Sequence, residues 1–252
     1  MGRNRHLSIV IFASFRYNEK NITEQEEVDK MTKAIEDAIS ALEYKDADYT
    51  KVDEAVKKVT VGLEKTSRKI SEKDKKLTAY HEAGHAIVSQ FLPTQTAVKE
   101  VSIIPRGMAG GYTMYKTNED KNYISKTEME ERLIALLGGR AAEKIALNDI
   151  STGASNDIEV ATKIAKNMVT VYGMSDVVGT ISINTEKDPY ELQMLGEKYT
   201  DAIGAEVKIL LDTAYAKAQK IILEHMDKLH AVAKTLLEKE TITEEEFERI
   251  FE

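Results

Sequence analysis

Residues 71–93 read SEKDKKLTAYHEAGHAIVSQFLP, and this stretch decides how the rest of the chain is interpreted. Ser71 is followed three residues later by Asp74, a pairing that satisfies the free amide groups at the start of a helix. An apolar stripe with helical spacing follows, made up of Leu77, Ala83, Ile87, Val88 and Phe91. Pro93 cannot continue a helix because it lacks an amide hydrogen and clashes with the preceding turn. The stretch therefore predicts one helix that begins after Ser71 and ends before Pro93.

Three polar residues on this predicted helix, His81, Glu82 and His85, form the pattern His-Glu-x-x-His. Successive helical residues advance by about 100°, so the two histidines project about 40° apart on one face and can bind one metal ion. Glu82 lies close enough to take a proton from a water molecule at that metal without being a ligand. The pattern predicts a metal site with Glu82 as general base. A chance match on a structural helix is the alternative.

Zinc is the metal that we expect at this site. The chain contains no cysteine, which excludes both a disulfide framework and a thiolate metal site. Zinc accepts histidine and carboxylate ligands, and a catalytic zinc has three protein ligands. Of the remaining histidines, His225 and His230 lie on a C-terminal amphipathic helix that we expect to be distant, so a carboxylate is favoured. From the residues alone, the candidates for the third ligand are Glu143, Asp149, Asp157 and Glu159.

The remaining sequence is mostly helical in pattern. Helices are predicted over 125–137, 140–147, 157–172, 200–224 and 226–238, with a last short one from Thr243. The pair Gly138-Gly139 is interpreted as an interruption between two of them. We therefore predict a mainly α fold, a helical bundle with a small β-sheet, that carries His-Glu-x-x-His on a helix.

The small sheet is predicted from residues 98–115. Val101, Ile103 and Ile104 favour a strand, and a glycine-rich turn and a second strand up to Tyr115 follow. The second strand, 111–115, is a candidate exposed edge to which an extended peptide could add by backbone hydrogen bonds. A plain core hairpin is the alternative. A further short strand is predicted over 177–183.

The composition argues against two classes of function, nucleic-acid binding and membrane insertion. The net charge is −8 and the pI is near 5.4, which gives no long-range attraction to nucleic acid. The apolar run Leu7 to Phe15 is shorter than the roughly 20 residues that span a membrane, and no small-residue cleavage site follows it. We therefore expect a cytoplasmic protein that does not bind nucleic acid.

The first part of the chain is treated separately. A capping pair at Thr23 and Glu26 and the apolar spacing that follows predict a helical hairpin over residues 23–61. We divide the chain into an N-terminal helical segment, 1–58, to which no role is assigned, and a zinc metallopeptidase domain, 59–252.

Several motifs, in the right order along the chain, resemble the peptidase domain of the FtsH family of membrane-bound AAA zinc proteases. They read AYHEAGHAIV, VSIIPRG, GGRAAEKI, STGASNDIEVATKIAKNMVTVYGMS and AYAKAQKIILEHMDKLHAVAKTLLEKETI. The resemblance implies that the third zinc ligand is the Asp of Ser-Asn-Asp, which is Asp157. Glu143 in GGRAAEKI is then expected to accept a hydrogen bond from a ligand histidine, with an ordinary ion pair as the alternative.

The same resemblance implies partners. Members of the family are membrane-anchored, form hexameric rings and join this domain to an ATPase that unfolds substrates. None of the 13 glycines here precedes a lysine, so the loop Gly-x-x-x-x-Gly-Lys that binds ATP phosphates is not in this sequence. We therefore expect no ATPase activity from this chain, and consider a homo-hexamer and a separate or deleted ATPase module as its partners.

Two functions are compared. The first is a zinc-dependent endopeptidase that cleaves unfolded proteins or peptides by metal-activated water, with Glu82 as general base. The second is a non-catalytic, metal-stabilised oligomeric module that binds unfolded polypeptide. Glu82 favours the peptidase, because a purely structural metal site needs no base.

Overall fold

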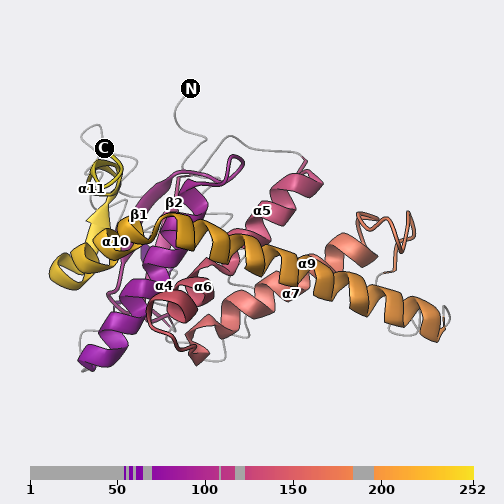
Figure 1. The fold of residues 1–252 in the computed structure, drawn as a ribbon, viewed down its shortest axis with the longest axis horizontal. Helices are drawn as coiled ribbons and strands as arrows, with labels where there is room; N and C mark the ends of the chain where they lie inside the picture. The colour runs from indigo at the N-terminus through magenta and orange to yellow at the C-terminus, as the bar shows by residue number, and fades with distance from the viewer. Residues whose placement is uncertain are drawn as a thin grey trace. The chain divides into compact units, whose positions relative to one another are not determined.

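The computed structural model describes residues 54, 57–58, 61–64, 70–107, 109–116, 123–183 and 196–252 (Figure 1). The chain divides into two compact units, one of residues 70–103 with 113–252 and one of residues 1–69 with 104–112. The helical hairpin predicted over 23–61 lies almost entirely outside the described residues. The predicted boundary between residues 58 and 59 stays a prediction.

Helix α4, Glu72–Gln90, is the helix predicted from the opening stretch. The Ser71 hydroxyl accepts a hydrogen bond from the backbone amide of Asp74 at 3.1 Å, and the helix ends three residues before Pro93. The apolar residues of its middle turns are fully buried, namely Ala79, Ala83, Ala86, Ile87 and Val88. Burial on several sides identifies α4 as the central helix of the core.

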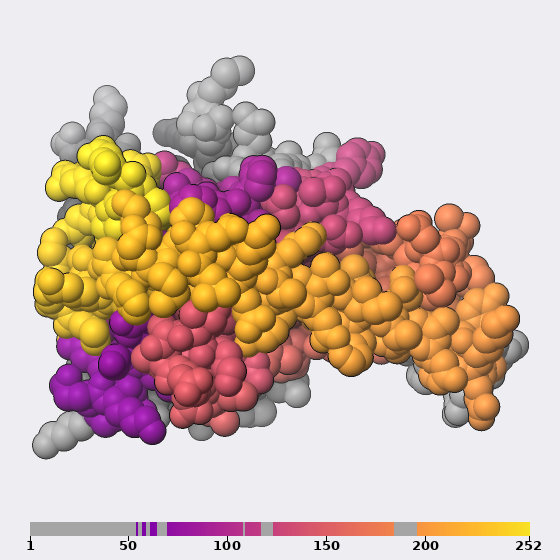
Figure 2. All heavy atoms as spheres, viewed as in Figure 1, coloured from indigo at the N-terminus to yellow at the C-terminus, as the bar shows by residue number. Residues whose placement is uncertain are grey.

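Six further helices are described, and four of them, over residues 126–136, 138–146, 197–224 and 226–239, pack against α4. The six are α5 (Lys126–Leu136), α6 (Gly138–Ala146), α7 (Ser155–Thr170), α9 (Glu197–Glu224), α10 (Met226–Lys239) and α11 (Glu244–Arg249), with a 3-10 turn at Thr152–Ala154. Figure 2 shows α9 and α10 as a continuous orange-to-yellow band across this face, with α4 and α6 below it. The prediction of a mainly α fold with a small sheet is confirmed. Within the described residues, no helix combines the length and the apolarity needed to cross a bilayer.

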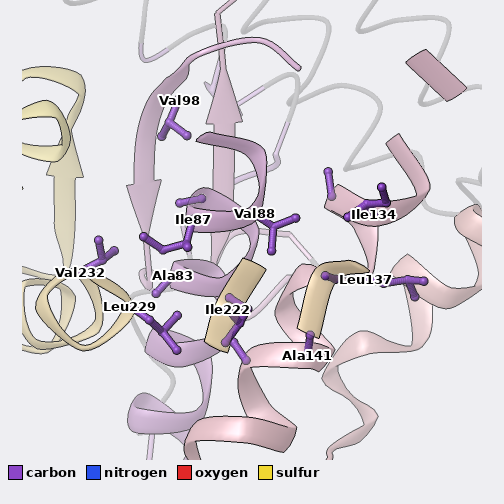
Figure 3. Packing of buried hydrophobic residues seen from close by; sticks show 14 of the residues in the cluster. Ala83, Ile87, Val88, Val98, Ile134, Leu137, Ala141, Ile222, Leu229 and Val232 are labelled. Carbon is purple, nitrogen blue, oxygen red and sulfur yellow. The ribbon is translucent and has the colours of Figure 1, made fainter. Parts of the chain in front are cut away.

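The core joins α4 to its neighbours through apolar side chains. Figure 3 shows Ala83, Ile87 and Val88 of α4 in the centre, with Leu229 of α10 on one side and Leu137 on the other. Burying a large aliphatic side chain stabilises the folded state by about 1.5–3 kcal/mol. This core fixes the axis of α4, and therefore the positions of the polar side chains that α4 carries.

The glycine pair Gly138-Gly139 was predicted to form the break between two helices, but it lies inside the second of them. Gly138 and Gly139 form the first turn of α6, and Leu137 alone separates the two helices. A Cβ atom at Gly138 would lie 2.8 Å from the carbonyl oxygen of Gly84, and one at Gly84 would lie 2.5 Å from the Cβ of Ala142. These glycines are therefore required by the close packing of α4 against α6, and not by a turn.

The sheet has three strands in the order β2-β1-β3, namely β1 (Val98–Ser102), β2 (Tyr112–Tyr115) and β3 (Thr241–Thr243). The predicted strand, turn and strand over 98–115 are confirmed. Strand β3 pairs antiparallel with β1 and was not predicted, because it has three residues and leads directly into the capping box of α11. Strand β2 lies at an edge of this sheet, which leaves one of its sides without a neighbouring described strand.

The short strand predicted over 177–183 is wrong. The hydroxyl of Ser175 accepts hydrogen bonds from the backbone amides of Val177 and Val178, which produces a turn. Gly179 then takes a φ of +82°, which breaks an extended run. The apolar residues of this segment are explained by a small separate cluster, in which Val178 and Ile183 are buried.

In the smaller unit, Arg106 is a buried charged residue that pairs with two carboxylates. Its side chain is 6% exposed and its guanidinium pairs with the carboxylates of Glu54 at 3.0 Å and Glu64 at 3.4 Å. Gly62 and Gly107 both have positive φ angles and approach closely, since a Cβ at Gly62 would lie 2.8 Å from the Cα of Gly107. These contacts hold residues 104–107 against Glu54 and residues 61–64.

Candidate metal centre

The two histidines of α4 turn their rings toward one another as the helical spacing predicts. The ring centroids of His81 and His85 are 4.7 Å apart, and their Nε2 atoms are separated by 3.0 Å. Both residues lie one turn apart on a helix that the core holds in place. The sequence pattern therefore corresponds to two ring nitrogens that converge on one point and could bind a metal ion.

Asp157 completes the cluster from the first turn of α7. Its Oδ2 atom lies 3.2 Å from Nε2 of His81 and 3.4 Å from Nε2 of His85. Ligand atoms that share a tetrahedral zinc at about 2.1 Å are about 3.4 Å apart, so the three separations suit that ion. Within the described residues, this is the one group of three such side chains that could hold a metal.

The outer ring nitrogens are held by acceptors. Nδ1 of His81 donates to Oε1 of Glu143 at 2.6 Å, and Nδ1 of His85 donates to the backbone oxygen of Ala135 at 2.9 Å. Glu143 is 1% exposed, and it also accepts hydrogen bonds from the backbone amide and hydroxyl of Ser151 at 2.7 and 3.1 Å. With both Nδ1 atoms protonated, both Nε2 lone pairs face the cluster. In this neutral tautomer, the two Nε2 lone pairs and the Asp157 carboxylate can share one cation, which takes the place of the protons that the two rings would otherwise bind.

The carboxylates around His81 raise its pKa, so they too favour positive charge at this position. Burial lowers the pKa of His81, but hydrogen bonds to Asp157 and Glu143 outweigh that effect and raise the pKa to about 10. Burial raises the pKa of Asp157, and the hydrogen bonds from His81 and His85 reverse this and hold it well below its usual range. The cluster is therefore an environment that attracts positive charge.

Glu82 lies beside the cluster without belonging to it. The side chain is 7% exposed, and burial raises the pKa of its carboxyl group. The hydroxyl of Thr113 on β2 donates to Oε2 of Glu82 at 2.9 Å. Glu82 is therefore a buried carboxyl group with a raised proton affinity, held beside the cluster by Thr113.

Gly139 belongs to the site, although the sequence analysis interpreted it as a break. A Cβ atom there would lie 2.6 Å from Nε2 of His85 and equally close to Cε1 and Nε2 of His81. Real Cβ atoms do not approach that closely, so the histidine rings occupy space that only glycine leaves free. The signal in the sequence was the glycine pair inside an otherwise helical pattern.

The other candidate ligands lie outside the cluster. Asp149 is exposed and its carboxylate accepts a hydrogen bond from the backbone amide of Ile150, and Glu159 is exposed on α7. The expectation that the helix of His230 lies far from α4 is wrong, because His230 of α10 is hydrogen-bonded to the hydroxyl of Tyr80 at 2.9 Å. His230 is nevertheless absent from the three-residue cluster.

A helix with His-Glu-x-x-His, completed by a carboxylate from a second helix, defines the class of zinc metallopeptidases. Comparison with known proteins then gives the family. A model of peptidase family M41 matches residues 68–250. The chain is 53% identical to the ATP-dependent zinc metalloprotease FtsH of Caldicellulosiruptor bescii over 206 residues, which are 79% of this chain and 33% of that protein.

Two further relatives agree. The identity is 52% over 207 residues with the ATP-dependent zinc metalloprotease FtsH 1 of a Thermoanaerobacter species, covering 79% of this chain and 34% of the relative. It is 42% over 206 residues with FtsH of Thermotoga maritima, with coverage of 79% and 34%. The chain belongs to peptidase family M41, which confirms the predicted resemblance and, for the family, the predicted enzyme class of zinc metalloendopeptidase. The chain spans about a third of the length of these relatives.

Proposed function

We propose that this chain is a zinc-dependent endopeptidase in which His81, His85 and Asp157 hold the metal and Glu82 is the general base. The observation that carries the proposal is the convergence of two Nε2 atoms and one carboxylate oxygen at 3.0, 3.2 and 3.4 Å. The zinc metalloproteases among the relatives support the choice of metal.

The chemistry divides between the metal and the side chains. Zinc at this site would lower the pKa of a water molecule and polarise the carbonyl of the scissile peptide bond. Glu82 accepts the proton that the water loses as its oxygen attacks the carbonyl carbon, and returns it to the amine nitrogen as the C–N bond breaks. A buried carboxyl group with a raised pKa suits the first transfer, because it binds a proton more readily than an ordinary carboxylate does.

The substrate that fits is an extended polypeptide. Strand β2 lies at the edge of the sheet and carries Thr113, which contacts Glu82. A peptide that adds to β2 by backbone hydrogen bonds would pass the general base with little dependence on its sequence. Unfolded segments adopt that extended conformation readily, so we propose unfolded proteins or peptides as substrates.

The partners follow from the relatives. Their names describe ATP-dependent enzymes, and this chain matches about a third of their length. We propose that an ATP-consuming module outside this sequence delivers unfolded substrate to the site. The homo-hexamer implied by the family resemblance stays a prediction.

One experiment separates the peptidase from a binding module. Cleavage of unfolded casein is measured for the wild type and for Glu82→Gln, with and without a chelator, and bound zinc is measured in both proteins. We expect cleavage by the wild type that the chelator abolishes, and a loss of at least about 100-fold in Glu82→Gln with zinc retained. Chelator-insensitive cleavage or equal rates in the two proteins would refute the peptidase. Retained zinc without cleavage by either would favour the binding module.

A further inference from the structure

The hydrogen bond between Thr113 and Glu82 has a direction that matters for the reaction. The hydroxyl of Thr113 lies 2.9 Å from Oε2 of Glu82 and 3.3 Å from the backbone oxygen of the same residue. A hydroxyl has one hydrogen to donate, and a bond to an ionised oxygen is the stronger of the two. The carboxylate therefore receives the donor on one defined oxygen.

This makes the two oxygens of Glu82 chemically different. An oxygen that accepts a hydrogen bond is less ready to bind a further proton than one that does not. In the described part of the chain no protein donor reaches Oε1. The proton taken up in the reaction is therefore directed to Oε1, while Oε2 stays attached to the strand.

The strand that carries Thr113 is itself fixed to α4. Thr113 and Tyr115 alternate with Met114 and so share one face of β2. The hydroxyl of Ser89 on α4 donates to the hydroxyl of Tyr115 at 3.0 Å. Two contacts, at Glu82 and at Ser89, therefore hold β2 along nearly two turns of α4.

We propose that Thr113 is a positioning residue for the general base, which holds Oε2 of Glu82 and leaves Oε1 to accept and return the proton. The inference rests on the proposed function, since it assigns a role within that reaction. Because β2 is also the proposed docking edge for the substrate, the residue that orients the base belongs to the strand that holds the peptide. The general base and the substrate are then both positioned by the same strand, β2.

The test uses the full chain loaded with zinc and a fluorogenic peptide substrate. Thr113→Val keeps the side-chain shape and removes the hydroxyl, and Thr113→Ser keeps the hydroxyl. Thr170→Val is the control, because the hydroxyl of Thr170 likewise donates to a protein oxygen, the backbone oxygen of Lys166 in α7, at 2.8 Å. Bound zinc and the melting temperature are measured for every variant.

We expect Thr113→Val to lower kcat about 10–100-fold with KM within about twofold, part of the 100–10,000-fold that a general base contributes. Thr113→Ser should stay within about threefold of the wild type, and Thr170→Val should be unchanged. A second readout needs no turnover. The affinity for a phosphinic peptide, which mimics the tetrahedral transition state, should fall in Thr113→Val by the same factor as kcat/KM.

The outcomes are distinguishable. A wild-type kcat in Thr113→Val, an equal loss in Thr113→Ser, or loss of zinc in Thr113→Val would overturn this inference alone. An equal loss in Thr170→Val would also overturn it, because it would show a general cost of removing a hydrogen-bonded hydroxyl. Absence of cleavage by the wild type would overturn the proposed function, and this inference with it.

Discussion

The crossing of α4 and α6 and the C-terminal segment from α10 to α11 are stabilised in different ways. At the crossing, Gly84, Gly138 and Gly139 leave no room for a methyl group, and the paired polar groups of His81 and Glu143 are buried. The C-terminal segment is instead filled by large aliphatic side chains, namely Leu229, Val232, Leu236 and Ile242. Its last helix begins at a solvent-facing capping box.

This difference determines how well each region tolerates a substitution. Hydrophobic burial and capping are spread over many contacts, so the C-terminal segment loses stability gradually when one contact is removed. At the crossing, one added carbon atom or one lost acceptor displaces the groups that converge on the cluster. We therefore expect changes at the crossing to affect metal binding and catalysis, and changes in the C-terminal segment to affect stability alone.

The largest effect is expected at Asp157. Asp157→Asn removes the negative charge and the carboxylate oxygen that meets both Nε2 atoms, so zinc affinity and peptide cleavage should fall more than about 100-fold, beyond what outer partners of ligands contribute. Glu159→Gln on the same helix is the matched control and should bind zinc normally. Competition with a zinc-chelating dye measures both. Equal zinc binding by the two variants would show that Asp157 is not a ligand.

A single added methyl group at the crossing should have the next largest effect. Gly139→Ala places a carbon 2.6 Å from ring atoms of both histidines, and the hydrogen bond of His81 to Glu143 prevents an easy shift. We expect zinc affinity to fall about 10–100-fold while the circular dichroism spectrum stays the same. Gly204→Ala in α9 is the control, since nothing lies within 4 Å of its Cβ position. Unchanged zinc affinity in Gly139→Ala would contradict the steric argument.

Glu143 should have a smaller effect on the metal. Glu143→Gln keeps an acceptor for His81 Nδ1 but removes the charge that makes this ring more basic, so zinc affinity should fall about 10-fold. Calorimetric titration with zinc measures the loss. Affinity equal to that of the wild type would show that the 2.6 Å contact is an ion pair without influence on the metal.

The smallest effect is expected in the C-terminal segment. Thr243→Ala removes the side-chain cap that accepts from the backbone amide of Glu246, and should lower the free energy of unfolding by about 1 kcal/mol without changing kcat. Urea denaturation and peptide cleavage measure the two quantities. Glu245→Ala in the same turn is the control. A change in kcat would show that the C-terminal segment and the crossing are not independent.

Local patterns made much of this architecture predictable. Ser71 with Asp74 and Pro93 marked the ends of α4, and the four-residue spacing of His81 and His85 placed both rings on one face, because these features depend on the helix alone. The residues could not select Asp157 from four carboxylates, because its distance to the histidines depends on how α7 packs against the rest of the core. Only the family resemblance favoured it, and the structure then placed it within 3.4 Å of both rings.

The misses have the same origin. Gly139 looked like a helix break because its neighbours in space, two rings from α4, are about 55 residues away in sequence. The contact of Thr113 with Glu82 could not be predicted, because it depends on how β2 packs against α4 and the two residues are 31 positions apart in the sequence. Strand β3 was too short to show an alternating pattern, and its pairing partner β1 lies near the other end of the domain.

The most direct test of the central claim is the location of the metal. The zinc-loaded protein is crystallised and the ion is found from its anomalous scattering. We expect one zinc bound by Nε2 of His81, Nε2 of His85 and a carboxylate oxygen of Asp157, each at about 2.0–2.2 Å. Zinc bound through Nδ1, coordinated without Asp157, or found only elsewhere on the protein would contradict it.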